Sequence, residues 1–420
     1  MKNTEIIKLL KSNKDISDFE LTIVDKDSSE LYYVLKNLEI NRSVKTKTTS
    51  INVYVDVKEF RGTSTIVVTA GDDVSSLTKK IKNAVKQAKN ALNPYFPLTD
   101  KTENYKGKKI NANLNEIASK AAESVFKADV YKDGWINSTE IFVTKSNIEF
   151  INSNGVHHFD SFFNIGIEVI PTWSNNKEEF ESYKYYDSST VNYNEITKEI
   201  EEILLLSKER SVAKTIDKVK LPKNIKILIK GDMRRLLAEN FADDICFRNV
   251  YNKMNHYSIG DKIGDDNLQI SLLPFYKGAV SSKNFDANGV LLKKKNIIKN
   301  GVVKSNWGGI MYGYYLKSKN ITGSLPIVSI DGTKEDYLDG KYLVIEHFSS
   351  PQLEEASGYF GGEVRLARYF DGKKFIPLTG FSISGNIYEL SKKITFSDDK
   401  VVESNYVGPK YMIFKGLSIH

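Results

Sequence analysis

The sequence is poor in cysteine and histidine and has no long apolar run. Its one cysteine, Cys246, excludes an intramolecular disulfide and any metal cluster built from several cysteines, and so favours a reducing compartment. No stretch reaches the ~20 apolar residues that a membrane span needs, and no apolar run of signal-peptide length follows the first residues. We therefore expect a cytoplasmic protein without membrane contact.

A strong excess of one charge is also missing. The 60 Lys and Arg residues against 53 Asp and Glu leave a formal charge of +7, and the densest basic run is only Lys293 to Lys295. Five more lysines are spread along the stretch from Leu77 to Leu92. A groove that binds nucleic acid also needs aromatic or arginine side chains near its cations. We interpret these lysines as solvated faces and do not expect nucleic acid as a partner.

The hydrophobic patterning predicts an α+β chain, with mixed α/β N-terminal and middle regions followed by a β-rich C-terminal domain. At 420 residues and 40% hydrophobic content, the chain has room for two or three domains. Asn93-Pro94 and Leu221-Pro222 are the clearest breaks. We divide the chain into an N-terminal α/β domain (1–95), a middle α+β domain (96–215) and a β-rich C-terminal domain (216–420).

Individual elements follow from hydrophobic periodicity. Helices are predicted over Glu5 to Leu10, Leu77 to Leu92 with Ser75 or Ser76 as N-cap, Leu114 to Phe126, Tyr193 to Leu206, and Met233 to Ala242. Strands are predicted over Phe19 to Val24, Leu31 to Leu35, Ile51 to Val57, Ser64 to Ala70, Ser138 to Thr144, Ile148 to Asn152, Asp160 to Ile170, Phe180 to Tyr186, and Ile225 to Ile229. Beyond Gly260, glycine and β-forming residues prevail.

Three glycine-containing phrases follow one another in the C-terminal third. They are Asp-Ala-Asn-Gly from Asp286, Ser-Gly-Tyr-Phe-Gly-Gly-Glu from Ser357, and Pro-Leu-Thr-Gly-Phe-Ser-Ile-Ser-Gly-Asn from Pro377. Earlier in the chain, Arg61-Gly62 lies between two strands and Ile151-Asn152-Ser153-Asn154-Gly155 precedes an aromatic-rich strand. In this order the phrases resemble the TldD/PmbA family of metalloprotease subunits, and the resemblance covers most of the chain.

The resemblance implies a heteromer that cleaves small unstructured peptides. The catalytic kind of subunit carries His-Glu-x-x-x-His on a helix and a later cysteine; the two histidines and the cysteine bind zinc, and the glutamate is the general base. Zinc lowers the pKa of its bound water to about 7, so that a carboxylate can take the proton. Here the corresponding residues run from Ala238 to Asp243, with Glu239 at the base position.

Two of the three implied zinc ligands have no donor in this chain. Ala238 cannot bind metal, no cysteine follows Cys246, and the sixth motif position holds Asp243. The chain therefore resembles the TldE/PmbA kind of subunit, which lacks the zinc motif. We expect no metal or cofactor on this chain, zinc only in a TldD-like partner, and no activity of the isolated chain.

Each of the other candidate groups has a structural interpretation beside the functional one. Glu239, Asp243 and Asp244 can form an acid/base pair or a Mg²⁺ or Mn²⁺ site, but on an amphipathic helix they more often form a solvated face. Cys246 can be a nucleophile or a small buried residue. Adjacent residues of a strand point to opposite faces, so His157-His158 is a poor ligand pair. Glu346-His347 is interpreted as part of a strand.

The glycines of the C-terminal phrases form the candidate peptide-binding segment, since an extended peptide can add its backbone to a glycine-rich strand edge. The residues are Gly358, Gly361, Gly362, Gly380 and Gly385. Tight turns are an equally good interpretation.

The leading hypothesis is a non-catalytic subunit that pairs with a TldD-like metalloprotease and holds its peptide substrate. The alternative is an autonomous hydrolase or a homodimeric peptide-binding module without zinc. A weaker one is a modulator of DNA gyrase, an older description of the family. Under the first two hypotheses we expect a homodimer in isolation.

Overall fold

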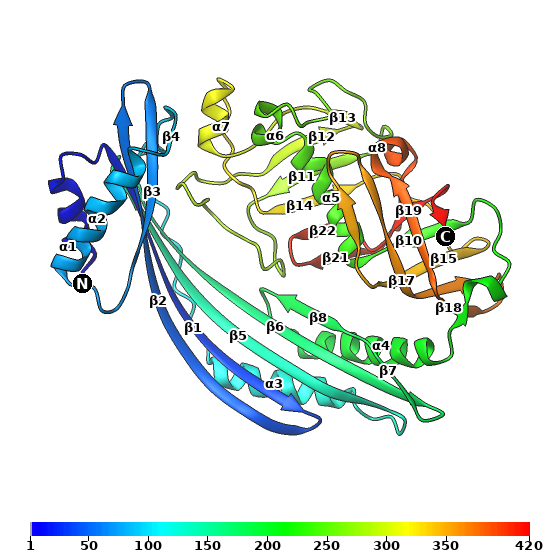
Figure 1. The fold of residues 1–420 in the computed structure, drawn as a ribbon. Helices are drawn as coiled ribbons and strands as arrows, with labels where there is room; N and C mark the ends of the chain where they lie inside the picture. The colour runs from blue at the N-terminus through cyan, green and yellow to red at the C-terminus, as the bar shows by residue number, and fades with distance from the viewer. Residues whose placement is uncertain (1, 102) are drawn as a thin grey trace.

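The structure, a computed structural model, describes residues 2–101 and 103–420. It confirms the predicted α+β class, with 42% strand and 22% helix. Figure 1 shows a long, curved sheet built from the first half of the chain, and a second, more compact body built from the C-terminal half. No helix in the described ranges is long and apolar enough to cross a membrane.

The long sheet has eight strands in the order β4-β3-β2-β1-β5-β6-β7, with β8 beside β6. All of its pairings are antiparallel. Its strands are β1 (Asp18–Val34), β2 (Asn37–Val57), β3 (Phe60–Val68), β4 (Leu92–Pro94), β5 (Gly134–Asn152), β6 (His157–Asn175), β7 (Glu178–Glu181) and β8 (Lys184–Ser188).

Three strand predictions in this sheet are wrong. One concerns β5, which continues through both of the strands predicted separately over Ser138 to Thr144 and Ile148 to Asn152. The sequence predicted separate strands over Phe19 to Val24 and Leu31 to Leu35, whereas β1 continues through the polar residues between them. Pairing with β2 on one side and β5 on the other fixes the backbone there, whatever the side-chain pattern. Conversely, the predicted strand from Phe180 to Tyr186 is broken into β7 and β8, which both pair with β6.

Four helices cover this sheet. The helices α1 (Asn3–Ser12) and α2 (Val74–Ala88) share one apolar cluster with β1, β2 and β3, while α3 (Leu114–Lys127) and α4 (Tyr193–Ser211) share another with β5 and β6. The N-cap of α2 is Asp73 rather than Ser75 or Ser76, because the Asp73 carboxylate accepts a hydrogen bond from the Ser76 backbone N–H at 2.7 Å.

One sheet thus contains strands from both sides of the division placed after residue 95. The strands before it (β1 to β4) and those after it (β5 to β8) meet where β1 pairs with β5 over Glu20 to Val34. The domain divisions after residues 95 and 215 stay predictions.

The C-terminal half contains a ten-stranded and a six-stranded sheet. The larger contains β9 (Lys214–Thr215), β10 (Lys226–Ile229), β15 (Tyr342–Phe348), β16 (Gln352–Glu354), β17 (Tyr359–Phe370), β18 (Phe375–Thr379), β19 (Phe381–Asn386), β20 (Thr395–Phe396), β23 (Met412–Phe414) and β24 (Ser418–Ile419). The smaller contains β11 (Gln269–Leu273), β12 (Lys295–Lys299), β13 (Val302–Val303), β14 (Ile327–Asp331), β21 (Lys400–Glu403) and β22 (Tyr406–Pro409).

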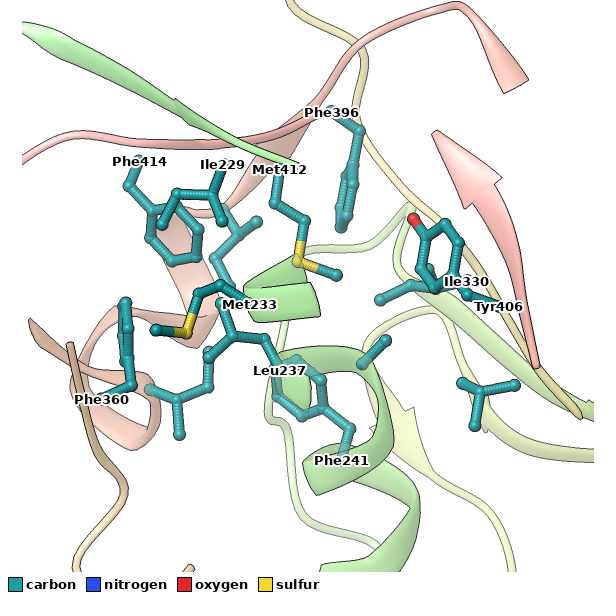
Figure 2. Packing of buried hydrophobic residues seen from close by; sticks show 14 of the residues in the cluster. Ile229, Met233, Leu237, Phe241, Ile330, Phe360, Phe396, Tyr406, Met412 and Phe414 are labelled. Carbon is teal, nitrogen blue, oxygen red and sulfur yellow. The ribbon is translucent and has the colours of Figure 1, made fainter. Parts of the chain in front are cut away.

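The helix α5 (Gly231–Asp244) lies in the core between these two sheets. Its Met233, Leu237 and Phe241 pack with Phe360 of the larger sheet and Ile330 of the smaller, as Figure 2 shows. The shorter helices α6 (Phe247–Tyr251), α7 (Ile310–Tyr315) and α8 (Ile387–Leu390) lie around it. The segment that the family resemblance singles out is therefore the central helix of the C-terminal half.

Candidate functional site

The first motif position on α5 is part of the hydrophobic core. Ala238 is fully buried, with apolar neighbours on α5 at Leu237 and Ala242. A methyl group has no lone pair to offer a metal, and a close-packed core leaves little room for a larger side chain. Position 238 therefore serves packing.

Glu239, at the base position, is engaged with two neighbours. The Nη1 atom of Arg235, one turn earlier, donates to its two carboxylate oxygens at 3.1 and 3.2 Å. The side-chain amide of Asn405 donates to the same carboxylate. The glutamate side chain is 22% exposed. Both oxygens thus accept hydrogen bonds from groups of the chain itself, and Glu239 links α5 to the segment between β21 and β22.

Asp243, at the sixth position, is partly buried. Burial, together with the negative charges of Glu355 and Glu239, raises the pKa of its carboxyl to about 6, while Arg248 opposes the shift. A carboxyl that titrates near neutral pH is a candidate acid or base. The expectation that this side chain belongs to a solvated face is wrong, because the two sheets enclose α5 on more than one side.

Asp244 is a structural carboxylate. It is 4% exposed and accepts hydrogen bonds from the backbone N–H groups of His256 at 2.8 Å and Tyr257 at 2.9 Å. The Nδ1 atom of His256 lies 2.9 Å from the same carboxylate, and its ring stacks on Tyr388. The solvated-face interpretation is wrong for Asp244 too, since it fixes the chain that follows α6.

The residues of the motif helix do not fit a zinc ion. Among the residues that the structure describes, no group of three His, Cys, Asp or Glu side chains comes together to hold a metal. Cys246 is partly buried, and burial raises the pKa of its thiol, which disfavours the thiolate that binds metal or attacks a substrate. Ala238 supplies no donor, and Glu239 already has Arg235 and Asn405 as partners.

The two histidine-containing pairs lie elsewhere. In β6, His157 is exposed and pairs with Glu149 at 2.7 Å, whereas His158 is buried, with its Nε2 3.0 Å from the carbonyl oxygen of Gly289. The two rings therefore point to opposite faces, as the strand geometry predicts. Glu346 and His347 belong to β15, as predicted, but lie at a bulge in its pairing with β17.

The glycine-rich segment offers no free strand edge to a peptide. Over Tyr359 to Gly361, β17 pairs with β16 on one side and with β19 on the other. A Cβ atom on Gly361 would lie 2.5 Å from the carbonyl oxygen of Ile383 in β19. A peptide therefore cannot add its backbone to β17 at these residues, and the expectation that it does so there is wrong. Gly361 is explained by the close approach of β19. Gly358 and Gly380 have positive φ angles of 72° and 73°, which fits turns.

Gly362 and Gly385 are also crowded. A Cβ atom on Gly362 would lie 3.0 Å from the Phe348 side chain, and one on Gly385 would lie 2.5 Å from that of Leu417. Neither position leaves space for a bound molecule against the glycine itself. Any role of the segment in peptide binding stays a prediction.

A large cleft separates the long sheet from the C-terminal half. Its volume is about 1450 Å³, and its walls come from β8, α4, the start of α5, the end of β15, and β21. Figure 1 shows β8 on the side of the long sheet that faces the C-terminal half. Within the described residues, β8 pairs only with β6 and β21 pairs only with β22, so each presents an unpaired edge. Sequence patterns alone cannot bring these two distant strands together.

The inner wall of the cleft holds a buried ion cluster. The carboxylate of Glu346, whose side chain is fully buried, pairs with Lys230 and with Arg368, whose Nε donates to it at 2.6 Å. Burial would raise the pKa of Glu346, but the two cations outweigh it and hold the pKa below its ordinary value. The neighbouring His347 has its pKa lowered to about 4 by burial and by Lys230, and is neutral at pH 7.

The cleft reaches the motif helix at Arg235, which lines it while holding Glu239. Eight acidic and eight basic side chains line the whole cleft. Sequence analysis missed this site because Lys230, Glu346 and Arg368 come from three separate strands and loops. The one available signal was a Glu-His pair directly after the apolar run Tyr342 to Ile345.

Comparisons with known proteins agree with the architecture. No curated protein matches this sequence. Among solved structures, TldE from Thermococcus kodakarensis matches with a TM-score of 0.78 and 15% identity over 99% of both chains. A candidate modulator of a DNA gyrase from Thermotoga maritima matches with a TM-score of 0.78 and 16% sequence identity over 99% of both chains. A further candidate modulator of DNA gyrase, from Bacteroides thetaiotaomicron, matches with a TM-score of 0.79 and 15% sequence identity over 100% of this chain and 99% of that one.

At such identities these likenesses show the fold alone. The sequence itself matches the family model of the PmbA/TldA metallopeptidase C-terminal domain over residues 222–420, the region that contains α5 and both C-terminal sheets. The C-terminal region, residues 222–420, therefore belongs to the PmbA/TldA metallopeptidase C-terminal domain family, and the whole chain has the fold of these solved structures.

Proposed function

We propose that this chain is the non-catalytic, TldE-like subunit of a heteromeric zinc metalloprotease that degrades small unstructured peptides. The proposal depends on one observation: helix α5, which carries the motif positions, offers neither the metal ligands nor a free base. Ala238 is packed into the core, and Glu239 is held by Arg235 and Asn405. A zinc protease needs metal ligands and an available base on this helix. The name of the Thermococcus kodakarensis relative, TldE, supports the same assignment.

In this proposal the chain holds the peptide in the cleft between the long sheet and the C-terminal half. A volume of about 1450 Å³ is large enough for several residues of an extended peptide. The unpaired edges of β8 and β21 supply backbone donors and acceptors for such a peptide. Exposed aromatic rings at Tyr183 and Tyr185 line the same cleft and suit apolar side chains.

The balance of charges in the cleft favours peptide over nucleic acid. Polyanions select surfaces where cations outnumber carboxylates, whereas here the two are equal in number. The description of two relatives as modulators of DNA gyrase applies to those proteins. We do not extend it to this chain.

The first experiment measures cleavage of an unstructured peptide and zinc content for the chain alone, for a TldD-like subunit from the same organism, and for their mixture. We expect zinc only in the partner, and cleavage that this chain increases. Stoichiometric zinc and chelator-sensitive cleavage by this chain alone would overturn the proposal.

A second experiment tests the cleft as the place of binding. Tyr185→Ala removes an aromatic ring that is 47% exposed on β8, within the cleft. We expect it to raise KM of the mixture and leave kcat unchanged, because the ring contacts substrate and not the reacting atoms. The matched control is Tyr314→Ala, which removes a ring that is 45% exposed and lies outside the cleft lining. Equal effects of the two substitutions would exclude the cleft.

A further inference from the structure

An irregular pairing of β15 with β17 shapes one part of the cleft wall. The register moves from Leu366 to Val364 between two successive residues of β15, so Arg365 has no residue opposite it. The strands on the other side of β17 leave the same gap, because β18 pairs with it from Ala367 onward and β19 pairs with it up to Val364. Bulges of this kind re-aim side chains and are frequent beside active sites. Arg365 is exposed and lines the cleft.

A second arginine, Arg210 in the last turn of α4, lines the same cleft. Its Nη1 donates to the backbone carbonyl oxygen of Glu181, at the end of β7. The carboxylate of Glu181 has another partner, since the side-chain amide of Asn137 donates to it at 2.8 Å. Burial and then the positive charge of Arg365 lower the pKa of the Arg210 guanidinium, while Glu181 opposes the shift. The two like charges therefore lie near each other.

These two arginines differ from other cations of the cleft in having no carboxylate partner. Lys184, Lys230 and Arg235 line the cleft and form ion pairs with carboxylates. Among the residues that the structure describes, neither Arg210 nor Arg365 forms an ion pair. A guanidinium group presents its N–H donors in a planar fork that matches the two oxygens of a carboxylate. A bound carboxylate would therefore offset the repulsion between the two arginines and satisfy their donors.

The free edge of β8 gives a bound peptide a direction. All pairings in the long sheet are antiparallel, and within the described ranges β8 pairs with β6 alone. A peptide that continues this pattern on the free edge runs opposite to β8, so its C-terminal end lies beside Lys184, the first residue of β8. Arg210 reaches Glu181, shortly before Lys184. The other end of β8 lies at Gly278, whose carbonyl oxygen accepts from the Ser189 backbone N–H at 3.0 Å.

We propose that Arg210 and Arg365 bind the terminal carboxylate of a peptide that lies antiparallel to β8. The inference rests on the proposed function, because it takes the cleft as the place of the peptide, and it adds the chemical group that the cleft selects. Every peptide with an unmodified C-terminus carries this group, so the site recognises a chain end without reading the sequence. An Asp or Glu side chain offers the same chemistry, and the first test separates the two sources.

The first test measures binding of dye-labelled unstructured peptides to the full chain by fluorescence anisotropy, with the dye at the peptide's N-terminus. Three forms are compared: a peptide that ends in glutamine as the free acid, its C-terminal amide, and the amide with glutamate as the last residue. We expect the acid to bind about tenfold more tightly than either amide, because only the acid has a carboxylate at the end of its backbone. Equal binding of the acid and its amide, or tight binding of the glutamate amide, would overturn the inference and leave the peptide in the cleft. No binding of any form would overturn the proposed peptide site as well.

The second test is the ratio of the amide and acid dissociation constants in single variants. In Arg365→Gln, which changes an exposed side chain, we expect the preference for the acid to fall to about twofold, and Arg210→Gln should act in the same direction. Both peptide forms are measured on the same variant, so a loss of folded protein does not change the ratio. The matched control is Lys277→Gln, which removes an exposed cation of the cleft beside Gly278 and should keep the preference near tenfold. A preference that survives Arg365→Gln, or that Lys277→Gln removes equally, would overturn the assignment.

Discussion

Arg235 and Glu239 form an ion pair one helical turn apart on α5, with Nη1 3.1 Å from one carboxylate oxygen and 3.2 Å from the other. Asn405 donates to the same carboxylate from the segment between β21 and β22. The glutamate that matches the family's general base therefore joins the central helix to the smaller sheet. A residue with both oxygens engaged in this way contributes to structure rather than to proton transfer.

Glu239→Gln tests this assignment. The glutamine keeps the size of the side chain and loses the charge, so we expect unfolding to become easier by about 1 kcal/mol, the range of a partly exposed ion pair. Peptide cleavage by the mixture with a TldD-like partner should stay within about twofold. The same substitution at the glutamate of the partner's zinc motif serves as the control and should abolish cleavage. Equal losses from both substitutions would show that Glu239 is catalytic.

Restoring both histidines should not restore a zinc site. In Ala238→His/Asp243→His the first imidazole enters a fully buried position, and overpacking of this kind costs about 1–3 kcal/mol. The third ligand is still absent, and Glu239 stays paired with Arg235. We expect a lower Tm and no stoichiometric zinc by elemental analysis. The single variant Asp243→His, at a partly buried position, separates the packing cost at 238 from any effect at 243. Tight zinc binding by the double variant would contradict this account.

The sequence predicts local elements better than it predicts their surroundings. The periodicity of Met233, Leu237 and Phe241 was enough to place a helix, because it depends only on neighbouring residues. The same periodicity left Asp243 and Asp244 on a solvated face, since nothing local shows that sheets lie on both sides of α5. The cleft was unpredictable for the same reason, as its ion cluster joins Lys230, Glu346 and Arg368 through strand pairing.

Asp243 should make the protein less stable above neutral pH than it is in acid. Its folded pKa of about 6 is above the ordinary value of 3.8, so between these values the folded state binds a proton that the unfolded state has released. Stability therefore falls as pH rises from about 4 to about 6, and the penalty is complete above that window. We expect Asp243→Asn to stabilise the protein by about 3 kcal/mol at pH 7.5 and by less than about 1 kcal/mol near pH 4.

Denaturant unfolding of Asp243→Asn at the two pH values checks this expectation. Asp398→Asn, which removes an exposed carboxylate, is the control and should change little at either pH. A stabilisation of Asp243→Asn that is the same at both values would show that the carboxyl does not titrate in this window.

Glu346→Gln should be among the most damaging single substitutions. It leaves Lys230 and Arg368 beside a neutral amide in a buried place, and removing one partner of a buried ion cluster costs about 3–5 kcal/mol. Because the folded pKa of Glu346 lies below its ordinary value, its contribution is present at neutral pH and is lost as pH falls through the folded pKa. Replacing Lys230 by Met as well should recover part of the lost stability. Urea unfolding of the single and double variants measures both effects.

The effect of His347 on the pH dependence of stability should be opposite in sign to that of Asp243. Its folded pKa of about 4 is below the ordinary 6.5, so between these values the unfolded state binds a proton that the folded state excludes. Stability is lost as pH falls through this window, by about 2 kcal/mol at pH 5 relative to pH 7.5. His347→Gln cannot titrate, so the variant should gain by that amount relative to wild type on acidification. His157→Gln, at an exposed ring paired with Glu149, should show no such gain. If wild type and His347→Gln lose stability in parallel between pH 7.5 and 5, the imidazole is open to water, and the inner wall of the cleft is wetter than the packing around Glu346 implies.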